Sequence, residues 1–392
     1  MSVFPICLWY PPENTYDAWK LVAKCGFTIV PFHAPSVAEG LRVQDWLQEL
    51  KIKGMVQDPR VSPRLVDQPD WQDTVRQVVA DYGSHPALWG YFMADEPRFA
   101  GIEQLGKLSR AFQAADKDHI AHSNLLQITC DTRWLGTVDY RTYVRTYIEQ
   151  VRPSLLSYDE YALVEEGDRP EYLTNLEAVR DEALRAGLPF MNIFLTVPHF
   201  AYRDPSPEDL RYQVYTSLAY GAKGLTYFTY LTPDIENYHE AVTSIHGHPT
   251  EKYPHVRQLN LELQKLGPWL LKLTSTCVYH TGTAPAGCQR HVGTEAFTQA
   301  DGSGCDLLVG EYVDDSQRPW VMVVNKDRQH SAWVKVKLHT KHQQIQEVAR
   351  STGEFRSIAR DSGTRAAAGY VDGMVVQFWL APADGRLMRL SD

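Results

Sequence analysis

Short apolar runs alternate with amphipathic stretches along about the first 270 residues of the chain. Each run has the length and the apolar character of a buried strand. The runs occupy residues 3–9, 28–32, 54–57, 88–93, 122–126, 155–158, 191–197 and 225–230. We expect each of them to form a strand of a parallel sheet, because a helical pattern follows each one.

The stretches between these runs repeat apolar residues at helical spacing. In residues 70–82, Trp71, Val75 and Val78 recur on one face, which predicts a helix. Residues 206–219 open with Ser206 as an N-cap, Pro207 at the first helical position and two acids in the first turn. The chain is therefore expected to alternate strand and helix eight times.

Eight such units are enough to close a (β/α)₈ barrel. The alternative, an open doubly wound sheet, favours a glycine-rich turn after its first strand, and residues 9–14 contain no glycine. After about residue 272 the segments become short and β-rich, at 305–312, 320–325, 332–338 and 374–380. We predict an α/β fold with a TIM barrel over residues 1–272, followed by a small antiparallel β-sandwich over residues 273–392.

Composition and charge narrow the possible partners. The chain has 392 residues, of which 44% are hydrophobic and 22% charged, as in an ordinary globular protein. A net charge of −9 without a basic run argues against nucleic acid, and no apolar stretch approaches the roughly 20 residues that cross a membrane. The first residues lack the pattern of a signal peptide, which predicts a cytoplasmic protein, or an exported one if a signal has been removed. The sequence predicts no particular oligomeric state.

Catalytic groups of a barrel lie at the C-terminal ends of its strands and on the loops that follow. Carboxylates, aromatic rings and amides predominate there, without a Ser-His-Asp elbow, a CxxC pair or a His-x-x-x-His helix. This predicts acid–base chemistry on a carbohydrate, with no metal and no cofactor. Aromatic rings at these positions suit sugar rings, which present C–H faces. The residues expected to bind substrate are Trp9, Tyr10, His33, Asp58, Asp95, Asn124, Trp134, Tyr161, His199 and Tyr230.

The most informative stretch runs from an apolar strand at residues 88–93 directly into Asp95, Glu96 and Pro97. Pro97 restricts the backbone of Glu96 and holds it at the tip of the strand. Glu96 is therefore the candidate catalytic acid. The alternative is that both acids only begin a loop and favour the start of the next helix.

This stretch resembles the Asn-Glu-Pro signature on the fourth strand of clan A glycoside hydrolases, with Asp95 in place of the usual Asn. Residues 157–161 and 217–228 are similar to segments of the family-42-like barrels. The resemblance implies that Glu96 is the acid/base and that the substrate is a glycoside or an oligosaccharide. That clan carries a second Glu on strand seven, whereas residues 190–199 contain no acid.

Asp159 is the predicted second catalytic carboxylate, because strand six ends there and aims it toward the same space as Glu96. Asp58 and Asp234 are lesser alternatives, and Asp159 can also be a structural residue that binds loop amides. We expect a sugar-sized gap between Glu96 and its partner. A gap of about 5–5.5 Å indicates retention of configuration, and one of about 6.5–9.5 Å indicates inversion.

Two other function classes fit the same residues. The missing acid on strand seven is compatible with a non-catalytic carbohydrate-binding barrel, a pseudoenzyme. Asp58, Glu96, Asp159 and His33 also have the donor atoms of a divalent-metal site, as in a barrel isomerase or lyase.

Overall fold

The computed structural model describes residues 3–339, 341–342, 344–358, 370–372 and 375–391. Eight parallel strands, each followed by at least one helix, make up the first part of the chain, which confirms the predicted α/β alternation. The strands are β1 (Ile6–Leu8), β2 (Ile29–His33), β3 (Lys53–Gln57), β4 (Leu88–Asp95), β5 (Ile120–Asn124), β6 (Leu156–Asp159), β9 (Phe190–Leu195) and β10 (Leu225–Phe228). Every predicted strand in this part overlaps one of them.

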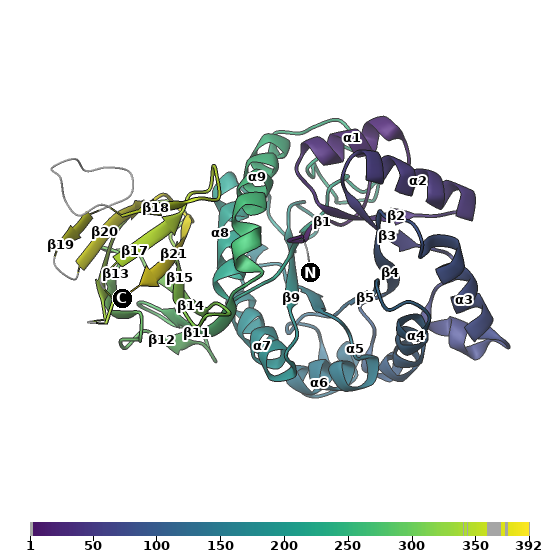
Figure 1. Cartoon of the computed structure of the whole chain (residues 1–392), viewed down its shortest axis with the longest axis horizontal. Helices are drawn as coiled ribbons and strands as arrows, with labels where there is room; N and C mark the ends of the chain where they lie inside the picture. Colours follow the sequence, from purple (N-terminus) through teal and green to yellow (C-terminus); the bar gives the residue numbers. More distant parts are fainter. Residues whose placement is uncertain (1–2, 340, 343, 359–369, 373–374, 392) are drawn as a thin grey trace.

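The helices that follow these strands lie outside them (Figure 1). They are α1 (Tyr16–Lys24), α2 (Val37–Glu49), α3 (Trp71–Tyr82), α4 (Ile102–Ala115), α5 (Thr132–Leu135), α6 (Tyr140–Val151), α7 (Glu171–Ala186), α8 (Pro207–Ala219) and α9 (Lys252–Leu270). Two short 3₁₀ segments, η1 (Pro63–Asp67) and η2 (Phe99–Gly101), and a small hairpin of β7 (Leu163–Val164) and β8 (Gly167–Asp168) lie in the connecting loops. At α8, Ser206 and Asp209 form the reciprocal capping box typical of a helix start.

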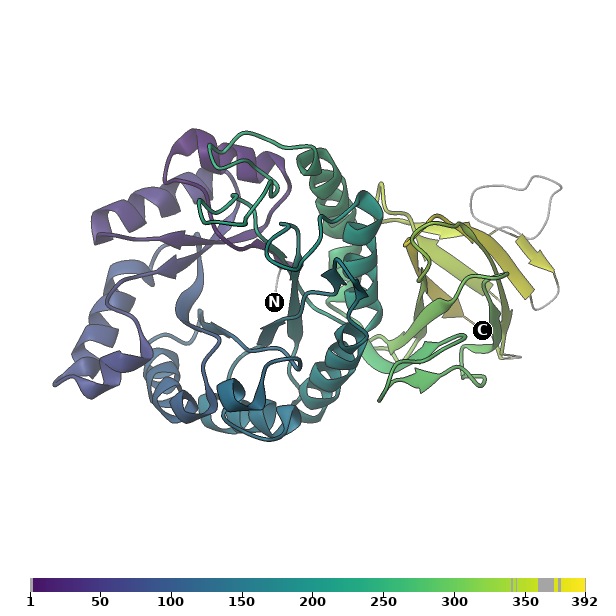
Figure 2. The same ribbon diagram turned by 180° about the vertical axis from the view of Figure 1, so that it is seen from behind.

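The eight strands form two four-stranded sheets, with the orders β1-β10-β9-β6 and β2-β3-β4-β5. Hydrogen bonds join the edges of these sheets on both sides. The amide of Thr28, just before β2, donates to Ile6 in β1 at 3.0 Å, and the amide of Leu125 donates to Ser157 in β6 at 2.8 Å. Figures 1 and 2 show the strands arranged as a ring inside the helices.

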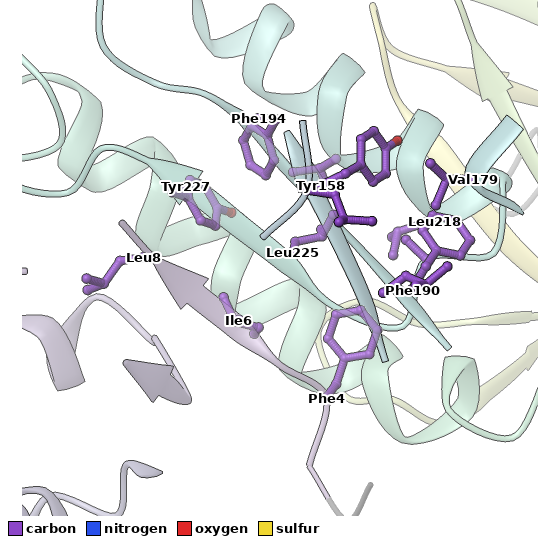
Figure 3. Close-up of a cluster of buried hydrophobic side chains, with 14 of the residues drawn as sticks. Phe4, Ile6, Leu8, Tyr158, Val179, Phe190, Phe194, Leu218, Leu225 and Tyr227 are labelled. Atoms are coloured by element: carbon purple, nitrogen blue, oxygen red, sulfur yellow. The ribbon is translucent and has the colours of Figure 1, made fainter. Parts of the chain in front are cut away.

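Two apolar layers hold this ring together. Side chains such as Leu8, Tyr158, Phe194 and Leu218 fill the space between the strands and the outer helices (Figure 3). The alternate positions on the strands point inward, and a separate buried cluster there includes Cys7, Ile29, Leu155 and Met191. These side chains fill the interior of the ring near the starts of the strands.

The C-terminal part contains a seven-stranded sheet, β12-β11-β14-β15-β21-β17-β18, and a four-stranded sheet, β13-β16-β20-β19. Apolar side chains from both sheets, among them Val323 and Val334, share one buried core. The strands are β11 (Thr274–His280), β12 (Gln289–Arg290), β13 (Phe297–Asp301), β14 (Leu307–Val313), β15 (Pro319–Asn325), β16 (Ala332–Leu338), β17 (Gln344–Val348), β18 (Phe355–Ser357), β19 (Tyr370–Asp372), β20 (Val375–Leu380) and β21 (Gly385–Ser391). The predicted segment 374–380 begins at Met374, which lies outside the described residues.

The outer face of the seven-stranded sheet packs on the helices that follow β9 and β10. The hydroxyl of Tyr312 in β14 donates to the carbonyl of Leu218 in α8 at 2.6 Å. The ring of Trp320 in β15 lies 5.7 Å from that of Trp269 in α9. These contacts lie on the side of the ring, away from the ends of the strands.

Candidate active site

Three carboxylates gather at the C-terminal ends of β4, β5 and β6. Asp95 and Asp159 are the last residues of β4 and β6, and Glu96 follows Asp95. Asn124, the last residue of β5, lies between them, and its Nδ2 donates to Asp159 Oδ1 at 2.8 Å and to Asp95 Oδ1 at 3.3 Å. Ser157 Oγ donates to Asn124 Oδ1 at 3.0 Å, which fixes the orientation of the amide. Four of the residues predicted from the sequence are thus brought together.

The backbone at Glu96 is left-handed, with φ of 46°, which is uncommon for a residue with a side chain. Its amide donates to the carbonyl of Asn124 at 2.9 Å. The carbonyl of the next residue, Pro97, accepts a bond from the Tyr143 hydroxyl at 2.6 Å. These bonds hold a conformation that costs energy, a feature that is frequent at functional sites.

Glu96 and Asp159 lie within hydrogen-bonding distance of each other, and the pKa of each is raised. Burial is the largest cause for both. At Glu96 the negative charge of Asp95 adds to it, while the hydrogen bond with Asp159 acts in the opposite direction. At Asp159 the negative charge of Glu96 adds to the effect of burial. Asp159 is 5% exposed, and this burial holds its pKa well above its usual range. Two carboxyl groups in contact titrate as a pair that shares one proton.

This contact corrects one expectation from the sequence. We expected a sugar-sized gap between Glu96 and Asp159, of at least about 5 Å, whereas the two side chains meet directly. The left-handed backbone lets the side chain of Glu96 reach across the end of β5 to β6. Strand alternation alone does not anticipate this direction.

Glu160, the neighbour of Asp159, points the other way and is fully buried. Thr129 Oγ1 donates to it at 2.9 Å and Arg169 Nη1 lies 3.5 Å away, but burial raises its pKa from 4.5 to about 7. The raised pKa favours the folded state relative to the unfolded state. This contribution is complete below pH 4.5 and is lost as the pH rises to about 7. The loss amounts to about 3 kcal/mol of unfolding free energy.

We therefore expect Glu160→Gln to reduce the fall in thermal stability between pH 5 and pH 8. The measurement is the midpoint of thermal unfolding at both pH values. Glu166→Gln, which changes an exposed carboxylate in the same loop, should behave as the wild type. Equal losses in wild type and Glu160→Gln would contradict the assignment of a buried, protonated Glu160.

Aromatic side chains stand next to the carboxylates, at the end of β10 and on the loops after β6, β9 and β10. The ring of Tyr161 lies 5.1 Å from Phe228 and 6.1 Å from His199. His199 is buried, stacks on Tyr238 at 4.6 Å, and donates from Nδ1 to the carbonyl of Val197 at 2.9 Å. Burial lowers the pKa of His199, so its ring is neutral and presents Nε2 as an acceptor.

Phe228 and Tyr238 are not among the residues predicted from the sequence. Phe228 lies on the inward side of β10, because Leu225 and Tyr227 face the helices (Figure 3). Strand alternation could have identified it. Tyr238 lies in the irregular segment between β10 and α9, where no periodic pattern marks its position.

Other predicted residues lie around the same end of the ring. Trp9 contacts Phe92 edge-on at 5.7 Å, and Tyr10, after β1, is 39% exposed. His33 and Asp58, with Phe92, line a hollow of about 430 Å³ at the ends of β2 and β3. Trp134 in α5 is 52% exposed.

Two of the residues expected to bind substrate already make close contacts within the protein. Tyr230 is 1% exposed and packs on Phe27 in the helical layer, because β10 ends at Phe228 and the alternation does not continue. Its ring therefore lies in the layer between the strands and the helices. Asp58 pairs with Arg60 Nη2 at 2.7 Å and accepts from Tyr82 at 3.1 Å, and these bonds lower its pKa although burial acts to raise it. The carboxylate oxygens of Asp58 therefore already have hydrogen-bond partners within the protein.

The donors of the metal-dependent alternative do not form one ligand set. Asp58 is bound by Arg60, while Glu96 and Asp159 bind each other. Among the residues that the structure describes, no group of three or more His, Cys, Asp or Glu side chains could hold a metal ion. Over the same residues, no helix is both long and apolar enough to span a membrane.

No protein-family model matches the chain, and no curated protein sequence matches it. Solved structures do. The chain aligns with beta-galactosidase from Bacillus circulans sp. alkalophilus at a TM-score of 0.62 and 10% identity, over 99% of each chain. It aligns with a glycoside hydrolase family 5 protein from Bacteroides vulgatus at 0.58 and 12% identity, over 99% of this chain and 88% of that one.

A beta-galactosidase from Marinomonas ef1 aligns at a TM-score of 0.54 and 11% identity, over 71% of this chain and 63% of that enzyme. At these identities the likeness concerns the fold. The chain therefore has a fold that is also found in glycoside hydrolases.

Proposed function

We propose that this chain is a glycosidase, a (β/α)₈ barrel over residues 1–272 with a β-sandwich accessory domain over residues 273–392. Within the glycoside hydrolases we assign it to the family-42-like group of clan A, because Asp95-Glu96-Pro97 stands at the end of β4. Its substrate is a glycoside or oligosaccharide. Glu96 is the general acid and Asp159 the second carboxylate.

The observation that carries this proposal is the contact between Glu96 and Asp159 in a buried position that raises the pKa of both carboxyl groups. A general acid must hold a proton near neutral pH, and a carboxyl group does so only when burial or a neighbouring charge raises its pKa. Both causes act on Glu96. Asp95, which is exposed next to it, shows that solvent reaches this part of the site.

In this proposal the glycosidic oxygen takes the place of Asp159 as the hydrogen-bond partner of Glu96. The proton moves from the pair to that oxygen while the bond to the anomeric carbon breaks, and the bonding electrons leave with the alcohol. Water then adds to the anomeric carbon, and the proton it releases restores the pair. Rotation of Glu96 away from Asp159 opens the gap that the sugar needs.

The neighbouring aromatic rings support a carbohydrate as the substrate. Tyr161, Tyr238 and Phe228 offer flat apolar faces beside polar groups, a combination that fits the C–H face and the hydroxyls of a pyranose. Trp9 and Tyr10 add two more aromatic rings after β1.

A second candidate is a carbohydrate-binding barrel without activity. One observation favours it: β9, the seventh strand of the ring, has the sequence Phe-Met-Asn-Ile-Phe-Leu and carries no acid. The two functions differ in a single experiment, a screen of chromogenic aryl glycosides with parallel titrations of the free sugars. We expect wild type to release the phenol from the glycoside of a sugar that it binds. Binding of sugars without any release would instead support the second candidate.

A further inference from the structure

Arg98 and Trp134 form a stacked pair on the rim of the candidate site. The guanidinium carbon of Arg98 lies 3.3 Å from the centroid of the Trp134 ring, and both side chains are exposed. A guanidinium held against an aromatic face keeps its N–H edges free. Those edges match the two oxygens of a carboxylate, which they can bind together.

The backbone on both sides of this pair is held in place. At Gly136, the residue after α5, φ is +84°, and a Cβ there would lie 3.2 Å from the Cβ of Phe99. The segments that carry Arg98 and Trp134 therefore lie against each other. At the start of α5, Asp131 accepts from the amide of Arg133 at 2.8 Å. The segments that carry the stacked pair are thus held close to each other.

The pair also lies next to Glu96. Arg98 follows Glu96 by two residues, with the buried Pro97 between them. On the other segment, Cys130 lies close enough to Glu96 for that carboxylate to add to the burial that raises the pKa of the thiol. Trp134 stands one turn further along the same segment.

Arg98 differs from the other arginines at this end of the ring. Arg60, Arg133 and Arg169 each lie within 4 Å of a carboxylate. Arg98 has no such ion pair among the residues that the structure describes. Its guanidinium can therefore pair with an anionic ligand, which the carboxylates of Asp95, Glu96 and Asp159 on their own would repel.

We propose that Arg98 and Trp134 form a subsite for a uronic acid residue of the substrate. Arg98 binds the sugar carboxylate through its N–H edges, and Trp134 holds the guanidinium in the orientation that this requires. The subsite rests on the proposed glycosidase function, because it places the anionic sugar next to the bond that Glu96 protonates. It names the substrate class as acidic saccharides.

The test compares matched pairs of free sugars by NMR titration of the protein. The pairs are glucuronate with glucose and galacturonate with galactose. We expect wild type to bind one of the uronates about tenfold more tightly than its neutral partner, the gain typical of a charge-assisted bidentate contact. No preference in either pair would overturn the proposal.

Three variants locate the preference. Arg98→Gln should lose the preference and keep the affinity for the neutral sugar, and Arg98→Lys should retain only part of it, since an ammonium lacks the planar fork. Arg133→Gln, which changes the neighbouring exposed arginine, should leave both affinities as in wild type. Equal loss of neutral and acidic sugar binding in Arg98→Gln, with an unchanged thermal unfolding midpoint, would contradict the subsite.

Turnover of a glycoside by Glu96→Gln, measured beside the sugar titrations, separates this proposal from the proposed function. If Glu96→Gln keeps full turnover of a glycoside while the uronate preference still depends on Arg98, the acid assignment fails and the subsite stands. If turnover depends on Glu96 and no uronate preference exists, the subsite fails alone.

Discussion

Replacing Glu96 with Gln should lower kcat for a phenyl glycoside by about 10²–10⁴-fold, the usual contribution of a general acid, and leave KM nearly unchanged. Phenoxide is a poor leaving group, so its departure depends on the proton that Glu96 delivers. Gln keeps the size and the hydrogen bonds of the side chain but has no proton to give. Steady-state kinetics at the pH optimum measure the effect.

Glu103→Gln is the matched control, because Glu103 is an exposed carboxylate in the first turn of α4, where it pairs with Lys107. Its kinetics should equal those of wild type. If Glu96→Gln retains wild-type kcat on the phenyl glycoside, Glu96 is not the acid, and the loop-and-helix-start interpretation of Asp95-Glu96-Pro97 gains support.

Asp159→Asn should move the alkaline limb of the kcat/KM profile to lower pH by about one unit or more. In wild type the last proton of the pair leaves only when both carboxylates become negative at close range, which raises the pKa for that step. Asn carries no charge, so Glu96 ionises more easily and loses its catalytic proton at a lower pH. The amide can still accept from Asn124, which bonds Asp159 at 2.8 Å in wild type.

The readout of this variant is the position of the limb, not the height of the profile, because breaking the pair also lowers kcat. Asp118→Asn, which removes an exposed carboxylate after α4, should leave the profile where it is. A limb that stays in place or moves to higher pH in Asp159→Asn would show that Asp159 does not control the proton on Glu96.

The positions of the strands could be predicted from the sequence because burial imposes a simple pattern. The eight strands of the ring lie between the inner cluster and the helices, so each appears as a short apolar run. The helix from Pro207 to Ala219 was predictable from Ser206 and Pro207, since capping depends on a few neighbouring residues. Long-range hydrogen bonds join the two four-stranded sheets at both edges. No local sequence pattern predicts these bonds.

The candidate site was predictable only in part. The strand-end rule selected Asp95, Asn124 and Asp159, and these residues do meet. The contact between Glu96 and Asp159 depends on a left-handed backbone at Glu96, which the following proline did not reveal. The pairing of Asp58 with Arg60 was missed because a short-range ion pair has no hydrophobic signature.

The dependence of kcat/KM on the acidity of the leaving phenol tests the central claim most directly. It is measured with a series of aryl glycosides of one sugar, from phenyl to dinitrophenyl, for wild type and Glu96→Gln. If the shared proton of Glu96 and Asp159 protonates the leaving oxygen, wild type shows a shallow dependence and Glu96→Gln a steep one, with nearly equal rates on the most acidic phenol. Parallel lines for the two proteins would contradict it.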